Sequence, residues 1–220
     1  MIKKETLGFL SRLKKNNNRD WFEKNKQLYL DAKENVENTV EEIIAEVRKI
    51  DRRIPAELSA RKCMFRIYRD IRFSKDKRPY KTNMGAMINP GGKMASVPGY
   101  YIHFEPGRTF LAGGIYMPGP AELAKIRQEI DYNFRDFKKI VSDKSFKKYF
   151  GELDQDDKLV TTPKGYAKDH PAIEFLKLKS FIVVAEISEK DTLSKNFAKT
   201  VAPVFKAMQP LHKFLQQAVD

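Results

Sequence analysis

The chain has 220 residues, of which 41% are hydrophobic and 32% are charged, so its composition is that of a folded globular protein rather than a disordered one. Its formal net charge of +13 favours polyanionic partners. The single cysteine, Cys63, excludes an internal disulfide and a metal site built from several cysteines. No apolar run approaches the ~18 residues that span a membrane, and Arg12 interrupts the apolar residues near the N-terminus. We therefore expect a cytoplasmic protein with no signal peptide and no membrane partner.

The N-terminal part of the chain has the apolar spacing of helices. Leu7, Leu10 and Leu13 predict a helix over about residues 3–15, which the asparagines at 16–18 end. A capping-box pattern, Asp20 with Glu23, then predicts one long helix over residues 20–50.

From Cys63 the apolar period changes to two, which predicts a strand over residues 63–73. Its apolar face would carry Cys63, Phe65, Ile67, Ile71 and Phe73. Its polar face would carry Arg66, Tyr68, Asp70 and Arg72. Arg69 interrupts the apolar side, which indicates a bulge or bend there. Cys63 would then be a buried, inert thiol.

Further strands are predicted over residues 84–88, 99–105, 109–117 and 181–187, where short apolar or β-branched runs lie between turn residues. The first three are consecutive and joined by tight turns, so the sheet should be antiparallel. Gly113 and Gly114 indicate either a close approach of a ligand to the backbone, or a bulge or close helix packing.

The remaining apolar patterns predict a helix that opens at residues 118–120 and runs to about residue 141, and a last helix over residues 193–215 that is kinked or restarted at Pro203 and near Pro210. This order of elements is typical of an α+β fold. We expect a mainly antiparallel sheet of about five strands, helices packed mostly on one face, and a single domain over residues 1–220.

The positive charge is concentrated in one segment, Arg61–Asn83. It contains nine basic residues and two acidic ones, so it contributes +7 of the net charge of +13. Four aromatic side chains lie among these charges. Because arginine forks hold phosphate or carboxylate through paired charge-assisted hydrogen bonds, the segment predicts an anion-binding surface. The candidate ligand-binding residues are Arg66, Tyr68, Arg69, Arg72, Lys75, Lys77, Tyr80 and Lys81.

Two readings of this segment stay open. In the first, the arginines bind a phosphate-bearing small molecule or nucleic acid; the interleaved aromatic residues are typical of proteins that bind single strands. In the second, the arginines lie on an ordinary solvated sheet face and pair with acidic side chains of neighbouring helices. No helix-turn-helix, zinc-finger or ribonucleoprotein-type motif supports nucleic acid specifically.

The sequence resembles an uncharacterised family, catalogued as domain of unknown function 2461, over nearly its whole length. The resemblance is carried by residues 65–70 (F-R-I-Y-R-D), 72–77 (R-F-S-K-D-K) and 79–83 (P-Y-K-T-N), and by further pieces. Those pieces are Trp21-Phe22, Tyr100-Tyr101-Ile102-His103, Glu105-Pro106-Gly107, Gly113-Gly114-Ile115-Tyr116, Ile126-Arg127, Pro163-Lys164-Gly165-Tyr166 and Asp169-His170-Pro171. The resemblance implies a bacterial or fungal single-domain protein and no assigned activity.

Catalysis needs a positioned acid, base or nucleophile. His103 and Glu105 lie two apart on a predicted strand, so they share a face and could form a base with its orienting carboxylate. Asp70 could be an acid, a base or a metal ligand, although neighbouring arginines favour a role in organising those arginines. His170 has the pattern of a turn residue, and His212 that of a packed helix residue.

No phosphate-loop, dinucleotide, nucleophile-elbow or zinc-protease motif is present, so we expect no cofactor and no metal site. Three hypotheses follow: an anion-binding domain, an enzyme that acts on a phosphorylated substrate or nucleic acid through Asp70, His103 or Glu105, and a protein-interaction scaffold. The ligand, the oligomeric state and the pathway do not follow from the sequence.

Overall fold

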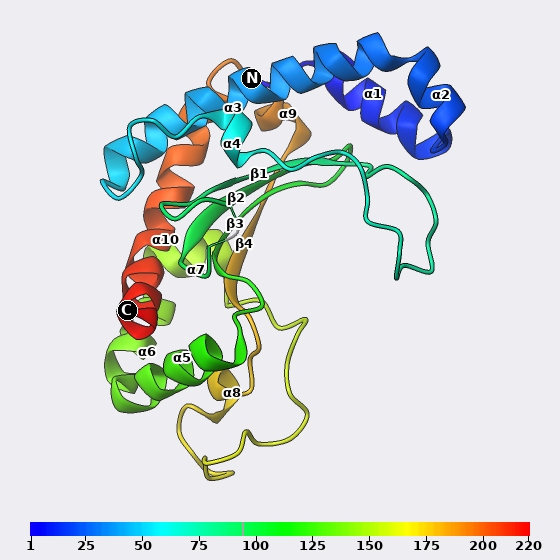
Figure 1. The fold of residues 1–220 in the computed structure, drawn as a ribbon. Helices are drawn as coiled ribbons and strands as arrows, with labels where there is room; N and C mark the ends of the chain where they lie inside the picture. The colour runs from blue at the N-terminus through cyan, green and yellow to red at the C-terminus, as the bar shows by residue number, and fades with distance from the viewer. Residues whose placement is uncertain (94) are drawn as a thin grey trace. The chain divides into compact units, whose positions relative to one another are not determined.

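The computed structural model describes residues 1–93 and 95–220, which form an α+β fold (Figure 1). Four strands form one antiparallel sheet in the order β1-β2-β3-β4. They are β1 (Met84–Ile88), β2 (Gly99–Phe104), β3 (Thr109–Ile115) and β4 (Phe181–Ile187). These ranges confirm four of the five predicted strands, and for β1 and β4 the predicted bounds are correct to the residue. The fifth, predicted over residues 63–73, is not a regular strand.

The described chain divides into two compact units. Unit 1 consists of Met1–Ile88, Tyr101–Leu111 and Glu186–Pro203. Unit 2 consists of Asn89–Tyr100, Ala112–Ala185 and Val204–Asp220. Strand β1 lies in unit 1, whereas β2, β3 and β4 each contribute residues to both units. The single domain over residues 1–220 stays a prediction.

Unit 1 begins with α1 (Lys4–Lys15), α2 (Arg19–Lys24) and α3 (Lys26–Ile50). Helix α1 confirms the predicted first helix. The prediction of one unbroken helix over residues 20–50 is wrong, because the chain breaks at Asn25, whose side-chain amide donates to the Trp21 carbonyl over 2.8 Å. The cap of α2 is Asn18 rather than Asp20, since its side-chain oxygen accepts the Trp21 backbone N–H at 2.9 Å.

The middle of the apolar stripe of α3 is fully buried, as its spacing predicts, at Val36, Val40, Ile43 and Val47, whereas its ends at residues 28 and 50 are half-buried. Helices α1 and α3 lie side by side, and α3 packs against β1 together with the short helix α4 (Ala60–Cys63) (Figure 1). Cys63 is buried at the end of α4.

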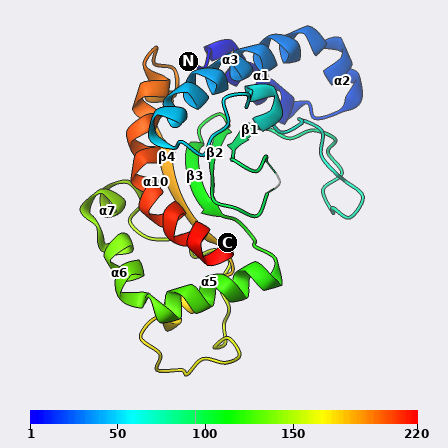
Figure 2. The same ribbon diagram turned by 60° about the vertical axis from the view of Figure 1, so that its left-hand side comes forward.

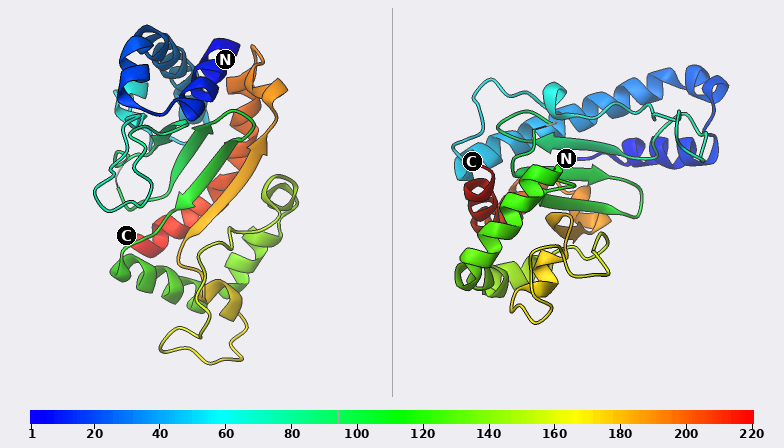
Figure 3. Two further views of the ribbon diagram at one scale, coloured as in Figure 1. Left: turned by 90° about the vertical axis from the view of Figure 1, so that its right-hand side faces the viewer. Right: turned by 60° about the horizontal axis from the view of Figure 1, so that its bottom comes forward.

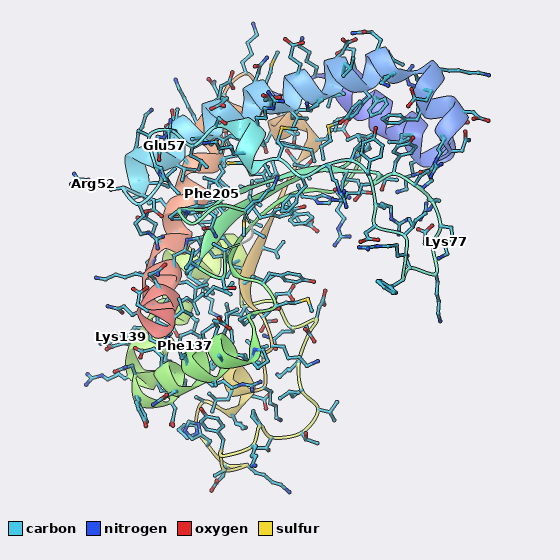
Figure 4. All side chains as sticks on the ribbon, in the orientation of Figure 1. Arg52, Glu57, Lys77, Phe137, Lys139 and Phe205 are labelled. Carbon is cyan, nitrogen blue, oxygen red and sulfur yellow. The ribbon has the colours of Figure 1, made fainter. Side chains whose placement is uncertain are left out.

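Alternation along β2 separates a covered face of the sheet from the opposite face. Tyr100, Ile102 and Phe104 are fully buried on the covered face. In unit 1 the Phe104 ring lies 6.0 Å from the Phe197 ring, between centroids. In unit 2 the Tyr100 ring lies 5.0 Å from that of Phe205, which Figure 4 labels. Residues 101, 103 and 105 therefore project from the other face.

The predicted helix over residues 118–141 is two helices in unit 2, α5 (Pro120–Tyr132) and α6 (Phe134–Ser142), because Asn133 ends the first. Helix α7 (Lys144–Phe150) follows them (Figure 2). A long connection with one short helix, α8 (Ile173–Leu176), then leads into β4, which lies next to β3 (Figure 3).

The C-terminal region consists of α9 (Glu189–Thr192) and α10 (Phe197–Val219). Helix α10 is one element, which excludes the restart at Pro203 or near Pro210; the kink there stays a prediction. Its apolar stripe is buried on both sides of these prolines, and that burial outweighs the hydrogen bonds that they cannot donate. Among the described residues, no helix has an apolar stretch sufficient to cross a bilayer.

Gly113 and Gly114 serve close packing in unit 2. A Cβ atom on Gly113 would collide with the Met208 sulfur and lie 2.8 Å from His212 Nε2, so β3 and α10 approach more closely than a side chain allows. Gly114 has φ 120° and faces the Phe181 carbonyl of β4. Of the alternatives that the sequence left open, close helix packing is confirmed.

Candidate functional site

The segment Arg61–Asn83, which we call the basic hairpin, belongs to unit 1 and projects beyond β1 (Figure 1). Two isolated antiparallel bridges hold it: Tyr68 pairs with Tyr80 inside the hairpin, and Met64 pairs with Ala86 of β1. Backbone hydrogen bonds of 2.8–2.9 Å join Arg69 to Pro79 and Lys81 to Ile67 between its arms, and Phe65 to Gly85 of β1. The hairpin therefore widens into a loop at residues 70–78.

The predicted strand over residues 63–73 is wrong: its first residue ends α4, only isolated bridges form at Met64 and Tyr68, and backbone pairing between the arms ends at Arg69. The Arg69 side chain is only 24% exposed, and its guanidinium binds an Asp76 oxygen at 2.5 Å across the loop. It also lies 3.4 Å from both Ser74 Oγ and the Arg78 carbonyl. This side chain closes the loop, so the residues beyond it no longer alternate between two faces.

Each acidic residue of the hairpin holds the arginine two positions later. Asp70 accepts hydrogen bonds from Arg72 through the backbone N–H at 3.2 Å, Nε at 3.0 Å and Nη2 at 2.6 Å. Asp76 holds Arg78 in the same way, with Nη2 at 2.7 Å. Asp51 and Arg53 repeat the arrangement outside the hairpin. We call this arrangement a D-x-R clamp.

The clamps keep both carboxylates ionised. The hydrogen bonds from Arg72 lower the pKa of Asp70 to about 2. The pKa of Asp76 is lowered too, first by hydrogen bonds from Arg78 and then by those from Arg69. Such a carboxylate is a poor base, which agrees with the expected organising role of Asp70.

The remaining predicted ligand residues do not share one strand face. Arg66 and Lys75 are exposed, and within residues 1–93 and 95–220 neither makes an ion pair. Lys77 donates to the Ile71 carbonyl at 3.0 Å, and the Lys81 ammonium lies 5.4 Å from the centre of the Phe65 ring.

The two tyrosines differ in exposure. Tyr68 is 47% exposed, whereas Tyr80 is buried and its ring stacks on Phe22 with centroids 4.0 Å apart. The backbone N–H of Tyr80 also bonds to Asn17. The Tyr80 ring thus anchors the hairpin to α2, and the exposed binding candidates are the charged residues and Tyr68.

On the face of β2 that carries residues 101 and 103, three side chains form a continuous hydrogen-bonded chain. The Tyr101 hydroxyl lies 3.0 Å from His103 Nδ1, and His103 Nε2 lies 3.3 Å from Glu105 Oε2. This confirms the prediction that His103 and Glu105 share a face. Thr82 of the basic hairpin donates to the other Glu105 oxygen at 3.2 Å, and Lys14 lies 3.7 Å from it.

Burial sets the protonation of this chain. Burial lowers the pKa of His103, which the hydrogen bond to Glu105 only partly offsets, so the imidazole is neutral. A carboxylate can only accept, so Nε2 carries the proton and Nδ1 accepts the Tyr101 O–H. Burial also raises the pKa of Tyr101 to about 12. Both His103 nitrogens are therefore hydrogen-bonded, and the Tyr101 hydroxyl is the last group of the hydrogen-bonded series.

Aromatic contacts hold the chain in place. The His103 ring stacks on Phe110 of β3 with centroids 4.4 Å apart and an interplanar angle of 14°. The Tyr101 ring meets Phe65 of the hairpin at 6.2 Å. A Cβ atom on Gly85 of β1 would lie 2.6 Å from the Tyr101 oxygen, so glycine leaves the space that the phenol fills.

A second polar cluster lies in unit 2. His170 Nε2 lies 2.8 Å from an Asp131 oxygen of α5, and His170 Nδ1 accepts the Ala172 backbone N–H at 3.1 Å. Arg127, also on α5, donates to the carbonyls of Leu176 and Leu178. These bonds fasten the connection before β4 to α5, so the expected turn residue His170 also bonds to a distant carboxylate.

Sequence reasoning missed Tyr101 and the D-x-R clamps. The signals were present, because residues 101, 103 and 105 alternate with the apolar residues 100, 102 and 104, and aspartate precedes arginine by two positions three times. Among the described residues, no group of three or more His, Cys, Asp or Glu side chains could hold a metal ion.

The comparisons with known proteins bear on the whole chain. No curated protein and no solved structure matches it significantly. The family described as conserved hypothetical protein (DUF2461) matches residues 5–214, which contain the basic hairpin, the Tyr101–His103–Glu105 chain and the His170 cluster. The protein therefore belongs to this family, as the motifs of the basic hairpin predicted.

Proposed function

We propose that the protein binds phosphate-bearing ligands at the basic hairpin. The observation that carries the proposal is the local charge: nine basic residues against two carboxylates, each of which an arginine of the hairpin already holds. A phosphate would supply the acceptors that the hairpin itself lacks.

The D-x-R clamp leaves Arg72 able to bind a ligand. Its hydrogen bonds to Asp70 use Nε and one N–H of Nη2, so three of the five guanidinium N–H groups stay available. The side chain is 76% exposed. Asp70 therefore holds the Arg72 guanidinium in one orientation and leaves its other N–H groups accessible. A side chain that is ordered before binding loses less conformational entropy when the ligand binds.

The test is polyphosphate binding as a function of salt, because polyphosphate carries no base or sugar. We expect affinity that falls steeply with salt. Arg66→Ala or Lys75→Ala should each lower the magnitude of the salt slope by about 0.7 if each contacts one phosphate, as in single-stranded polyanions. Arg135→Ala and Lys168→Ala, exposed positions of unit 2, are matched controls that should change nothing.

Binding that ignores salt, or no binding at low salt, would refute the proposal. Equal losses in the hairpin variants and the unit 2 controls would also refute it, because they would show a charge effect without a site.

The Tyr101–His103–Glu105 chain favours a second candidate, an enzyme that acts on a phosphorylated substrate. A neutral imidazole between a phenol and a carboxylate is the arrangement that transfers protons. Because both His103 nitrogens are engaged, proton transfer to a substrate would pass through the Tyr101 hydroxyl.

A panel of phosphomonoesters and phosphodiesters, with and without divalent metal, tests this candidate. We expect turnover that His103→Gln, Glu105→Gln and Tyr101→Phe reduce. Turnover that survives all three changes and Asp70→Asn would contradict the assignment, and a panel without turnover would leave binding as the function. For both candidate functions, we propose that the protein is cytoplasmic and that its partner is a phosphate-bearing small molecule or nucleic acid.

A further inference from the structure

An exposed aromatic ring lies in the middle of the loop of the basic hairpin. Phe73 is 95% exposed. Single exposed apolar residues are common on protein surfaces and need no function by themselves. What distinguishes Phe73 is the set of interactions that holds the loop around it.

The loop is fixed on both sides of the ring by its own side chains. Before the ring, Asp70 clamps Arg72 through three hydrogen bonds. After it, Ser74 Oγ accepts the Asp76 backbone N–H at 3.2 Å, and Asp76 holds both Arg69 and Arg78. The ring is thus presented to solvent from an organised loop, as aromatic contact residues are in binding sites that form before the ligand arrives.

The ring lies in a positively charged loop. The guanidinium carbon of Arg72 lies 5.8 Å from the centre of the Phe73 ring. Residues 69–78 contain five basic and two acidic side chains, a net charge of +3, and Figure 4 labels one of them, Lys77, on this loop. A matching ligand presents a flat π face next to closely spaced negative charges.

From these observations we infer that Phe73 stacks on an unpaired base of a single-stranded nucleic acid whose phosphates the basic hairpin binds. Among nucleic acids, single strands offer both groups together, because in a duplex the base faces are stacked on each other. The inference rests on the proposed phosphate binding and adds the class of the ligand.

An anionic membrane is the competing partner, and the observations favour it less. Even one myristoyl chain, which buries far more apolar surface than one phenyl ring, gives only marginal membrane binding. The nearest chain neighbours of the ring are the polar residues Arg72 and Ser74, so the loop presents no wider apolar tip.

The experiment compares two probes that carry the same phosphates. One is oligothymidylate of about 20 nucleotides, long enough to cover one binding site. The other is an abasic chain of the same length. We expect the oligothymidylate to bind about 5- to 150-fold more tightly, which is the effect of one stacked base. Phe73→Ala should abolish that difference without weakening the abasic probe, and Phe73→Trp should preserve it.

Val160→Ala is the matched control, since among the described residues Val160 is likewise a large apolar side chain with nearly full exposure, 96%, and it lies in unit 2. It should leave both affinities unchanged. Because Phe73 is exposed, circular dichroism should show Phe73→Ala folded like the wild type.

The outcomes separate the two proposals. Equal binding of the two probes, or no effect of Phe73→Ala, overturns base stacking and leaves phosphate binding intact. Binding of neither probe at low salt overturns both. Phe73-dependent sedimentation with phosphatidylserine vesicles, without preference for the base-bearing probe, overturns nucleic acid in favour of a membrane.

Discussion

The contact between Gly85 and Tyr101 gives the sharpest stability prediction, because it joins β1 to the Tyr101–His103–Glu105 chain. Gly85→Ala places a Cβ atom 2.6 Å from the Tyr101 oxygen and 3.0 Å from two of its ring carbons. The phenol must move, and it cannot move while it keeps its 3.0 Å hydrogen bond to His103 Nδ1.

The cost has two parts. Loss of the Tyr101 donor leaves the buried His103 acceptor unsatisfied, which costs about 1–3 kcal/mol. Displacement of a packed ring adds about 1–3 kcal/mol of strain. Tyr101→Phe alone should therefore cost the first part, and Gly85→Ala should cost both. The double variant should cost less than the sum, by about 1 kcal/mol or more, because the hydrogen bond is lost only once.

Urea unfolding followed by tryptophan fluorescence measures these values, since the only tryptophan, Trp21, lies in unit 1. Gly8→Ala is the control for the substitution itself. It lies inside α1 with nothing within 4 Å of the added Cβ, so it should stabilise by up to about 1 kcal/mol. Strict additivity in the double variant, or a neutral Gly85→Ala, would refute the reasoning.

Three other predictions test separate parts of the molecule. Because the folded protein holds His103 neutral, the unfolded state binds more protons below about pH 6.5, so stability should fall on acidification through that range. His103→Gln should remove this part of the slope, and equal slopes for both proteins would contradict the assignment. Asn18→Ala should lower the free energy of unfolding by about 1 kcal/mol, because it removes the cap of α2; urea unfolding measures the loss. Lys15→Ala, at a nearby exposed position, is the neutral control. Gly113→Ala should cost about 1–3 kcal/mol or more by thermal unfolding, because its Cβ meets Met208 and His212; a neutral result would show that α10 can shift away.

The sequence was sufficient for most of the fold because burial dominates local choices there. Alternating or continuous apolar runs fixed β1 and β4 to the residue, and the leucine spacing located α1. The breaks at Asn25 and Asn133 were missed, since the apolar stripe continues across them while an asparagine ends each helix.

The site was harder to predict because its geometry comes from polar contacts across the chain. The charge of the basic hairpin and the shared face of His103 and Glu105 were readable from spacing. The loop at residues 70–78 could not be predicted from spacing, because the Arg69 side chain bonds to Asp76, seven residues away, and the alternation of side chains ends there. The burial of Tyr80 depends on Phe22 of α2, a partner that local periodicity cannot reveal.

The most direct test of the basic hairpin as the ligand-binding surface is nuclear magnetic resonance during a titration with pyrophosphate at low salt. We expect the arginine Nε–Hε signals of Arg66 and Arg72 and the backbone amide signals of residues 61–83 to shift together. Signals of the exposed control Arg135 in unit 2 should stay in place. Shifts confined to residues outside the hairpin, or no shift at any pyrophosphate concentration, would contradict ligand binding by the basic hairpin.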